Sequence, residues 1–176
     1  MNRRIRGFLT VFLMGLSAAF AAGGVDSGGG KSVVCRDSAG KITSAEILDF
    51  YEGRVQYGFN ILKSQENYEK QSDLALAALG KGRGPSFTSE ILDAGHFAIS
   101  IKTILPDGTS LTDTTDSLHV IIPQNCKIEQ LANWTATNQV LINGEIWANI
   151  DETNKAALIA HEALYKSFRS FGATDS

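Results

Sequence analysis

The chain of 176 residues carries 16 Lys and Arg against 19 Asp and Glu, a formal net charge of −3, and 43% of its residues are hydrophobic. Its basic residues are scattered, without a run or stripe, so the charge does not favour nucleic acid or an anionic membrane surface as a partner. The length and hydrophobic fraction suit one domain with a single core.

The N-terminus has the pattern of a secretory signal peptide. Three arginines among the first six residues precede the apolar run Phe8–Leu16, and small residues follow, ending in Ala19-Phe20-Ala21. This pattern predicts that residues 1–21 are a cleaved leader, and the apolar run is too short to span a bilayer. We therefore expect an exported protein, periplasmic or extracellular. A Gly-rich flexible segment is expected at residues 22–31, ahead of one globular domain at residues 32–176.

The chain contains two cysteines, Cys35 and Cys126. In an exported protein this even count most simply predicts one disulfide bond. Such a bond would close a loop of about 90 residues, which the chain-entropy description values at about 4–5 kcal/mol. The alternative is a metal-binding or redox pair, and the lack of Cys-x-x-Cys spacing argues against it.

The first half of the chain alternates between strand-like and helix-like patterns. We expect a strand at residues 32–36 followed by a turn at residues 37–40. The capping-box sequence Thr43-Ser44-Ala45-Glu46 then predicts the start of a helix that continues up to Gly53. Alternating apolar residues predict a half-buried strand over Val55–Ile61, and an uninterrupted run predicts a helix over Ser64–Leu79.

The second half is expected to be rich in strands after a short helical turn at Ser86–Ala94. The expected strands are His96–Leu105, Leu118–Ile122, Cys126–Leu131, Gln139–Ile142 and Glu145–Ile150. The first two are expected to be hairpin neighbours, and Asn143-Gly144 predicts a type I′ turn between the last two. Asn133-Trp134-Thr135 also matches the acceptor triplet for N-glycosylation.

Asp151 is the expected N-cap of a final helix that runs from Glu152 to about Phe171. Apolar and aromatic residues repeat at helical spacing between Leu158 and Phe168, so this face is expected to be buried. The complete pattern predicts an α+β fold, with a small, mainly antiparallel sheet of about four to six strands and two principal helices packed on it.

The final helix carries the candidate for chemistry, His161-Glu162-x-x-Tyr165. It resembles the active-site helix of zincin metallopeptidases, in which two histidines of His-Glu-x-x-His bind zinc and the Glu polarises the bound water. The resemblance implies that His161 is a metal ligand and Glu162 a catalytic residue. Tyr165 replaces the second histidine, however, and a phenol is a poor zinc ligand. His96 and His119 are the other histidines of the chain, and no spacing joins them to His161.

Two interpretations without a metal also fit this helix. His161, Glu162 and Tyr165 share one side of it, so they could form a hydrogen-bonded polar network where the helix meets the sheet. Alternatively, His161 backed by Glu162 could act as a metal-free acid–base pair.

Several segments together resemble a group of exported bacterial proteins of unknown function. They are Val33-Val34-Cys35-Arg36, Ile47-Leu48-Asp49-Phe50-Tyr51-Glu52, the helix segment Ala157–Tyr165, and Gly172-Ala173-Thr174-Asp175-Ser176. The resemblance implies an envelope or extracellular setting, does not specify a substrate, and implies that related chains continue beyond the final Ser.

Two functions are compatible with these patterns. The first is a non-catalytic envelope or secreted factor that binds a protein or glycan partner and has no cofactor. The second is a degenerate or unusual zincin-like hydrolase that uses zinc, His161 and Glu162.

Overall fold

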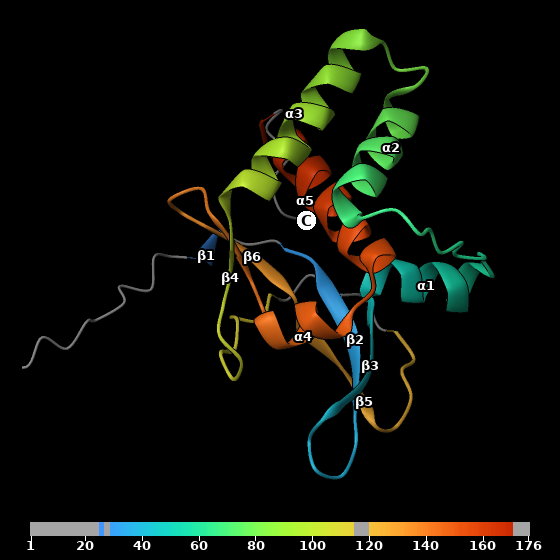
Figure 1. The fold of residues 1–176 in the computed structure, drawn as a ribbon, viewed down its shortest axis with the longest axis vertical. Coiled ribbons are helices and arrows are strands. Elements are labelled where there is room, and N and C mark those ends of the chain that lie inside the picture. The colour runs from blue at the N-terminus through green and yellow to red at the C-terminus, as the bar shows by residue number, and fades with distance from the viewer. Residues whose placement is uncertain (1–24, 27–28, 115–119, 171–176) are drawn as a thin grey trace, which may run out of the picture.

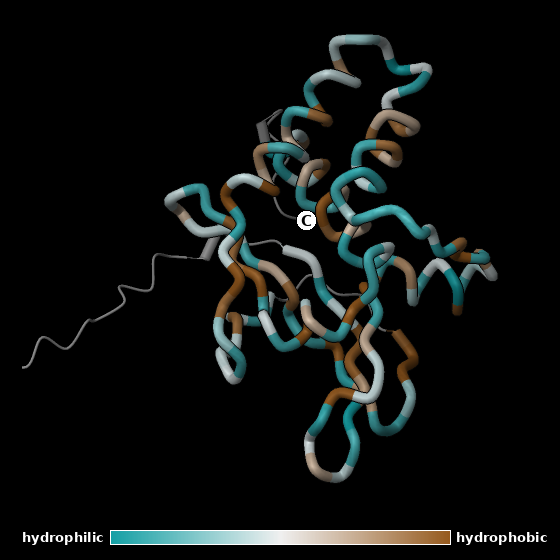
Figure 2. Tube along the Cα trace, in the orientation of Figure 1, coloured by the Kyte–Doolittle hydropathy of each residue, from teal (hydrophilic) through white to brown (hydrophobic). Residues whose placement is uncertain are grey.

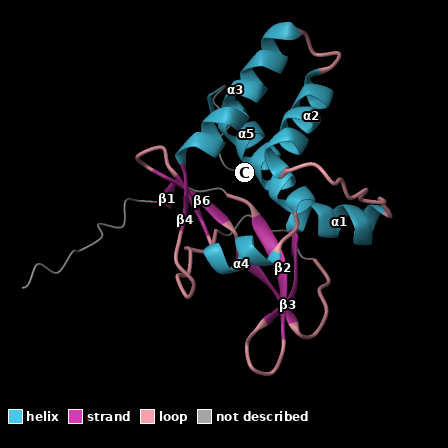
Figure 3. Ribbon diagram, viewed as in Figure 1, coloured by secondary structure: helices cyan, strands magenta, loops and turns pink. Residues whose placement is uncertain are grey.

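The structure is a computed structural model that describes residues 25–26, 29–114 and 120–170. Most of the helices gather at one end of the molecule and the strands at the other, and one short helix lies among the strands (Figures 1 and 3). This arrangement confirms the predicted α+β class. The predicted signal peptide at residues 1–21 lies outside the described residues, as does His119.

The strands form two sheets, and only the pair β4–β7 is parallel in the described part of the chain. One sheet has the order β1-β6-β7-β4 and the other the order β3-β2-β5. Their bounds are β1 Val25–Asp26, β2 Lys31–Arg36, β3 Ile42–Ile47, β4 Lys102–Ile104, β5 Cys126–Gln130, β6 Ala132–Thr135 and β7 Val140–Ile142. Because β6 follows β5 after one residue, Leu131, the two sheets share a buried junction.

The helices are α1 Leu48–Tyr57, α2 Tyr68–Gly80, α3 Pro85–Ile101, α4 Gly144–Asn149 and α5 Glu152–Ser170. The last of them, α5, packs on α2 and α3 and also touches β3, so that it lies between the helical pair and the strands (Figure 1). Leu158 and Ile159 of α5 are fully buried there. Leu158 joins a core that includes Val34, Ile47 and Ile142, and this contact fixes the helix on the sheet junction.

Cys35 and Cys126 form the predicted disulfide bond. They lie directly opposite each other in the antiparallel register of β2 and β5, with their Cα atoms 3.9 Å apart. The next residue, Arg36, donates hydrogen bonds to both carboxylate oxygens of Glu129 on β5 and of Glu145 on α4. The cross-link and this double ion pair therefore hold β2, β5 and α4 in one register.

The predicted capping box at residues 43–46 is wrong, because these residues belong to β3. Their side chains alternate along a strand paired with β2, and Glu46 forms an ion pair with Arg54 instead of capping a helix. The following helix, α1, begins at Leu48 without a side-chain cap. Strand pairing thus overrides a local helix-start signal.

The predicted strand over Val55–Ile61 is also wrong. Val55 and Tyr57 end α1, and the chain then continues as a loop. Val55, Tyr57 and Phe59 are between 48% and 68% exposed. Figure 2 shows the hydrophobic residues at the outer end of α1 and in the loop that follows. Their alternation therefore does not reflect a half-buried strand.

A strand was expected at His96–Leu105, but most of this segment is the C-terminal half of α3. Pro85 stands at the first turn of α3, where proline is favoured, and Ala94 and Ala98 bury one face of the helix. Only Lys102–Ile104 is a strand, and its partner is β7. The expected hairpin with residues 118–122 is absent in its described part, since residues 120–122 are not in a strand. The sequence therefore underestimates the number of principal helices.

Asn143-Gly144 does not form the predicted hairpin turn. The Asn143 side chain instead caps α4 by accepting a hydrogen bond from the backbone of Ile146 at 3.1 Å. Residues 145–149 are consequently helical, and β7 pairs with β6 across a turn in which Asn138 has a positive φ of 62°. The same residue type serves as a helix cap as readily as a turn residue.

The Gly-rich segment at residues 22–31 is ordered in its described part. β1 pairs with β6, and Gly29, Gly30 and Lys31 are buried. A Cβ atom on Gly29 would overlap the carbonyl of Ala132, and one on Gly30 would overlap the Leu158 side chain. These two glycines therefore permit close packing of the backbone instead of supplying a flexible linker.

Asn133 of the acceptor triplet lies in β6 with only 1% of its surface exposed. Its side-chain amide donates to the Thr112 carbonyl at 2.9 Å. The folded chain consequently offers no access to this side chain. Among the described residues, no helix is both long and apolar enough to cross a membrane.

Replacement of both cysteines by alanine is expected to lower the free energy of unfolding by about 2–5 kcal/mol, because the unfolded chain loses its cross-link. Urea unfolding followed by tryptophan fluorescence measures this change, and reduced wild-type protein serves as the control. Equal midpoints for the oxidised wild type and the double variant would show that the bond adds no stability.

Candidate functional site

The predicted start of the final helix is confirmed. The Asp151 carboxylate accepts a hydrogen bond from the backbone of Asn154 at 2.9 Å, and α5 then runs over Glu152–Ser170. Asn154 in turn accepts from the backbone of Ile47 at 2.8 Å. Because Ile47 ends β3 and directly precedes α1, this bond places the first turn of α1 beside α5.

Glu162 points into the interior and is fully buried. One carboxylate oxygen accepts from the backbone N–H of Gly30 at 2.7 Å, and the other accepts from the Trp134 indole at 2.6 Å. Burial raises the pKa of the Glu162 carboxyl, against the opposing effects of His161 and the two donors. This carboxylate therefore connects α5 to β6 and to the segment that precedes β2.

His161 points to the surface from the adjacent position on α5. Its Nδ1 lies 2.9 Å from an Asp49 carboxylate oxygen on α1, and the two side chains are 32% and 53% exposed. Burial of Asp49 opposes its ionisation, but the hydrogen bond and charge of His161 outweigh that effect and lower the pKa of Asp49. The pair thus keeps a carboxylate ionised at the protein surface.

Tyr165 takes a third direction. Its hydroxyl accepts from Arg169 at 3.1 Å, and the guanidinium lies 5.6 Å from the centre of its ring. These hydrogen bonds of His161, Glu162 and Tyr165 lead to α1, to the interior and along α5, respectively. The three side chains of the predicted polar network therefore point to three different parts of the protein.

The buried face of α5 also differs from the prediction. Leu158 is buried as expected, but Phe168 is 46% exposed, and Ile159, Glu162 and Ala163 point inward instead. Compared with the predicted orientation, α5 is rotated about its own axis, because Glu162 binds Gly30 and Trp134 in the interior. His161 and Tyr165 are consequently only half-buried.

This geometry does not favour a zincin-like centre at His161. A catalytic Glu must reach a metal-bound water, whereas both oxygens of Glu162 are occupied in the interior. His96 is on α3, where it pairs with Asp73 at 2.9 Å. Among the described residues, no group of three or more His, Cys, Asp or Glu side chains is placed to hold a metal ion.

An apolar groove of about 490 Å³ opens beside the Asp49–His161 pair, between α1, α2 and α5; we call it the His161 groove. Four alanines, Ala75, Ala156, Ala157 and Ala160, contribute to its lining. Its other lining residues are Asp49, Phe50, Gln71, Thr153, His161, Leu164, Tyr165 and Phe168. The groove combines a mainly apolar lining with one charged pair.

The motif on α5 identifies His161 and Glu162 but not their partners. Asp49 is 112 positions from His161, and Gly30 is 132 positions from Glu162. No local spacing could reveal either contact. Trp134 is the one partner that the sequence could have suggested, because a buried indole N–H usually needs a hydrogen-bond acceptor.

Comparison with protein families, curated proteins and solved structures gives no match to this chain. The function is therefore inferred from the geometry of its own residues.

Replacement of Glu162 by alanine is expected to lower the free energy of unfolding by about 2–4 kcal/mol, because it leaves two buried donors unpaired and opens a cavity. Replacement of His161 by alanine is expected to change it by less than about 1 kcal/mol, since its ion pair is solvent-exposed. Urea unfolding of both variants provides the comparison. A larger effect at His161 than at Glu162 would contradict the assigned orientation of α5.

The raised pKa of Glu162 also predicts a pH dependence. The folded protein favours the protonated form, so this contribution to stability is present below the unfolded-state pKa and is lost as pH rises through the folded-state pKa. The stability of the wild type relative to Glu162→Gln should therefore decrease as the pH rises above the unfolded-state pKa of about 4. Urea unfolding at several pH values tests this, and a difference that stays constant or grows would contradict it.

Proposed function

We propose that the protein is an exported, non-catalytic factor that binds a protein partner through the His161 groove. The observation that carries this proposal is a mainly apolar groove with a partly exposed ion pair in its lining. The disulfide bond supports an oxidising compartment, in agreement with the predicted signal peptide.

The lining of the groove is suited to an apolar side chain. Alanines on α2 and α5 leave space that larger side chains would fill, and Leu164 and Phe168 provide apolar contacts. Phe168 is 46% exposed and therefore has surface left to bury against a partner. Burial of apolar area contributes about 25 cal/mol per Å², so one anchoring side chain can supply a useful part of the binding energy.

The same lining favours a protein segment over a glycan. Sugar hydroxyls need hydrogen-bond partners when they are buried. Of the polar groups in the groove, Gln71 already donates to the Glu66 carbonyl, and Thr153 already accepts from the backbone of Ser64. An apolar protein side chain makes no such demand.

Asp49 gives the groove a preference for a positively charged residue of the partner. His161 lowers the pKa of its carboxyl, so this group stays ionised in neutral solution. More than half of the Asp49 side chain is exposed. A partner with a basic residue next to its apolar anchor therefore complements both features of the groove.

This proposal can be tested with the exposed alanines of α2. Ala75 lines the groove, whereas Ala77 is exposed on the same helix outside the groove lining. A displayed peptide library selected on the wild type should yield peptides that pair an apolar residue with a basic one. Their synthetic forms should bind Ala75→Arg at least about tenfold more weakly because the side chain and its charge fill the groove, and should bind Ala77→Arg as they bind the wild type.

Two outcomes would count against the proposal. Equal binding by wild type and Ala75→Arg would place the peptide elsewhere. Stoichiometric zinc in the purified protein that is lost in His161→Ala would favour the hydrolase instead, because the groove would then be a metal site.

A further inference from the structure

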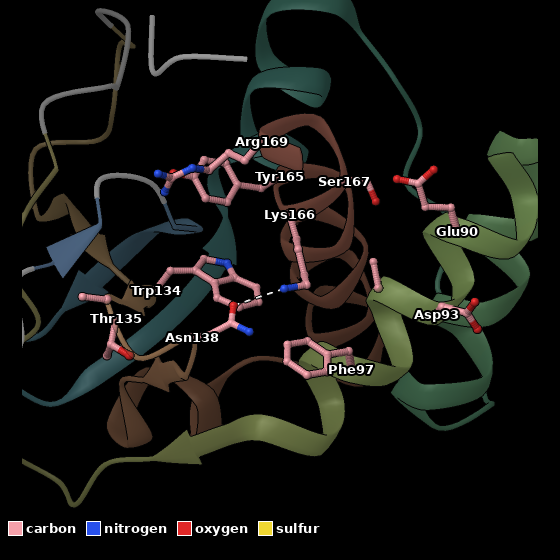
Figure 4. Close-up of a pocket in the computed structure, with 12 residues that line it drawn as sticks. Glu90, Asp93, Phe97, Trp134, Thr135, Asn138, Tyr165, Lys166, Ser167 and Arg169 are labelled. Carbon is pink, nitrogen blue, oxygen red and sulfur yellow. Dashed lines mark hydrogen bonds between the residues drawn. The ribbon is translucent and has the colours of Figure 1, made fainter. Parts of the chain in front are cut away.

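A second pocket, of about 650 Å³, lies between α3, α5 and the turn that joins β6 to β7. We call it the α3–α5 pocket. The His161 groove lies between α5, α1 and α2 and shares only Tyr165 with this pocket, so a ligand in the pocket does not require the function proposed for the groove. Figure 4 shows that charged groups of opposite sign line different sides of it.

Two cations of α5 line the pocket: Arg169, which donates to the Tyr165 hydroxyl, and Lys166. Its ammonium lies 4.3 Å from the centre of the Phe97 ring and 5.1 Å from that of Trp134, and it donates to the Asn138 side chain at 3.1 Å (Figure 4). None of these three partners is an anion. Partial burial lowers the pKa of Lys166. A partly desolvated cation with only neutral partners is a suitable place for an anionic group of a ligand.

Glu90 supplies the opposite charge from α3. It is half-buried, and in Figure 4 its carboxylate points across the pocket from the α3 side towards α5. Within the described part of the chain, no ion pair joins Glu90 to Lys166 or to any other cation. Asp93 of α3 also lines the pocket, with its carboxylate pointing away from Lys166 in Figure 4. The two sides of the pocket are therefore of opposite charge and leave space between them.

An apolar surface connects these two sides. Phe97, which belongs to α3 like Glu90, reaches the Lys166 ammonium, and Trp134 of β6 lies beside the same ammonium (Figure 4). The volume falls within the range of small-molecule sites, about 300–1,000 Å³. It exceeds what a simple inorganic anion would fill.

We propose that the α3–α5 pocket binds a zwitterion, a free amino acid or short peptide whose carboxylate pairs with Lys166 and whose ammonium pairs with Glu90. An apolar side chain of the ligand lies against Phe97. A lone anion would leave Glu90 without a counter-charge, and a lone cation would meet Lys166. The zwitterion is the one of these three classes that satisfies both walls.

The dipeptide Ala-Phe and its blocked forms test this proposal. Nuclear magnetic resonance titration of the complete protein follows the backbone amides of the pocket and the Trp134 indole N–H. Free Ala-Phe should bind, and N-acetylation or C-amidation should each weaken binding about tenfold, as expected for loss of one charge-assisted hydrogen bond. Lys127, an exposed residue of β5 away from the pocket, provides the control variant Lys127→Met.

Variants assign the two ends of the ligand. Lys166→Met should abolish the effect of C-amidation and keep that of N-acetylation, whereas Glu90→Gln should do the reverse. Glu90 forms no side-chain hydrogen bond or ion pair with the described residues, so Glu90→Gln should fold and keeps the test valid even where Lys166→Met fails to fold. Absence of shifts up to about 10 mM Ala-Phe, equal binding of the blocked forms, or equally tight binding of acetate would overturn the proposal.

Discussion

The hydrogen bonds of the buried Glu162 carboxylate are the interaction on which the arrangement of this protein depends. A fully desolvated acid is tolerated only where donors meet it, and here the donors are the Gly30 backbone and the Trp134 indole. Those groups belong to the segment before β2 and to β6, so one side chain fixes α5 against both. Gly30 must lack a side chain for this to happen, since Leu158 and Glu162 occupy the space beside it.

Because Glu162 is held in the interior, the orientation of α5 determines which of its side chains reach the protein surface. Successive helical residues are about 100° apart, so His161 turns outward towards Asp49 on α1. Lys166, four positions after Glu162, lies over Trp134, whose indole donates to Glu162. The His161 groove and the α3–α5 pocket are therefore both consequences of one helix rotation. The helix α5 thus supplies a charged side chain to both the groove and the pocket, while its interior contacts stabilise the fold.

Local signals in the sequence predicted the parts of the fold that depend on neighbouring residues. Asp151 capped α5 as expected, and the short strand and turn around Arg36 also follow from local chemistry. The hairpin at Asn143 and the strand at His96 failed because the same patterns suit a helix cap and an amphipathic helix. At the site, the motif identified His161 and Glu162, but the helix rotation depends on Gly30 and Trp134. Contacts between residues so far apart in the sequence cannot be predicted from the spacing of neighbouring residues.

The acceptor triplet at Asn133 has a consequence for the environment in which the chain can mature. Asn133 is buried in β6 beside Trp134, and its amide is bonded to the Thr112 carbonyl. An oligosaccharide attached there during synthesis would occupy the space that β6 and the loop around Thr112 need. A chain with a sugar on Asn133 is therefore incompatible with this fold, and correct folding requires that the triplet stay unmodified.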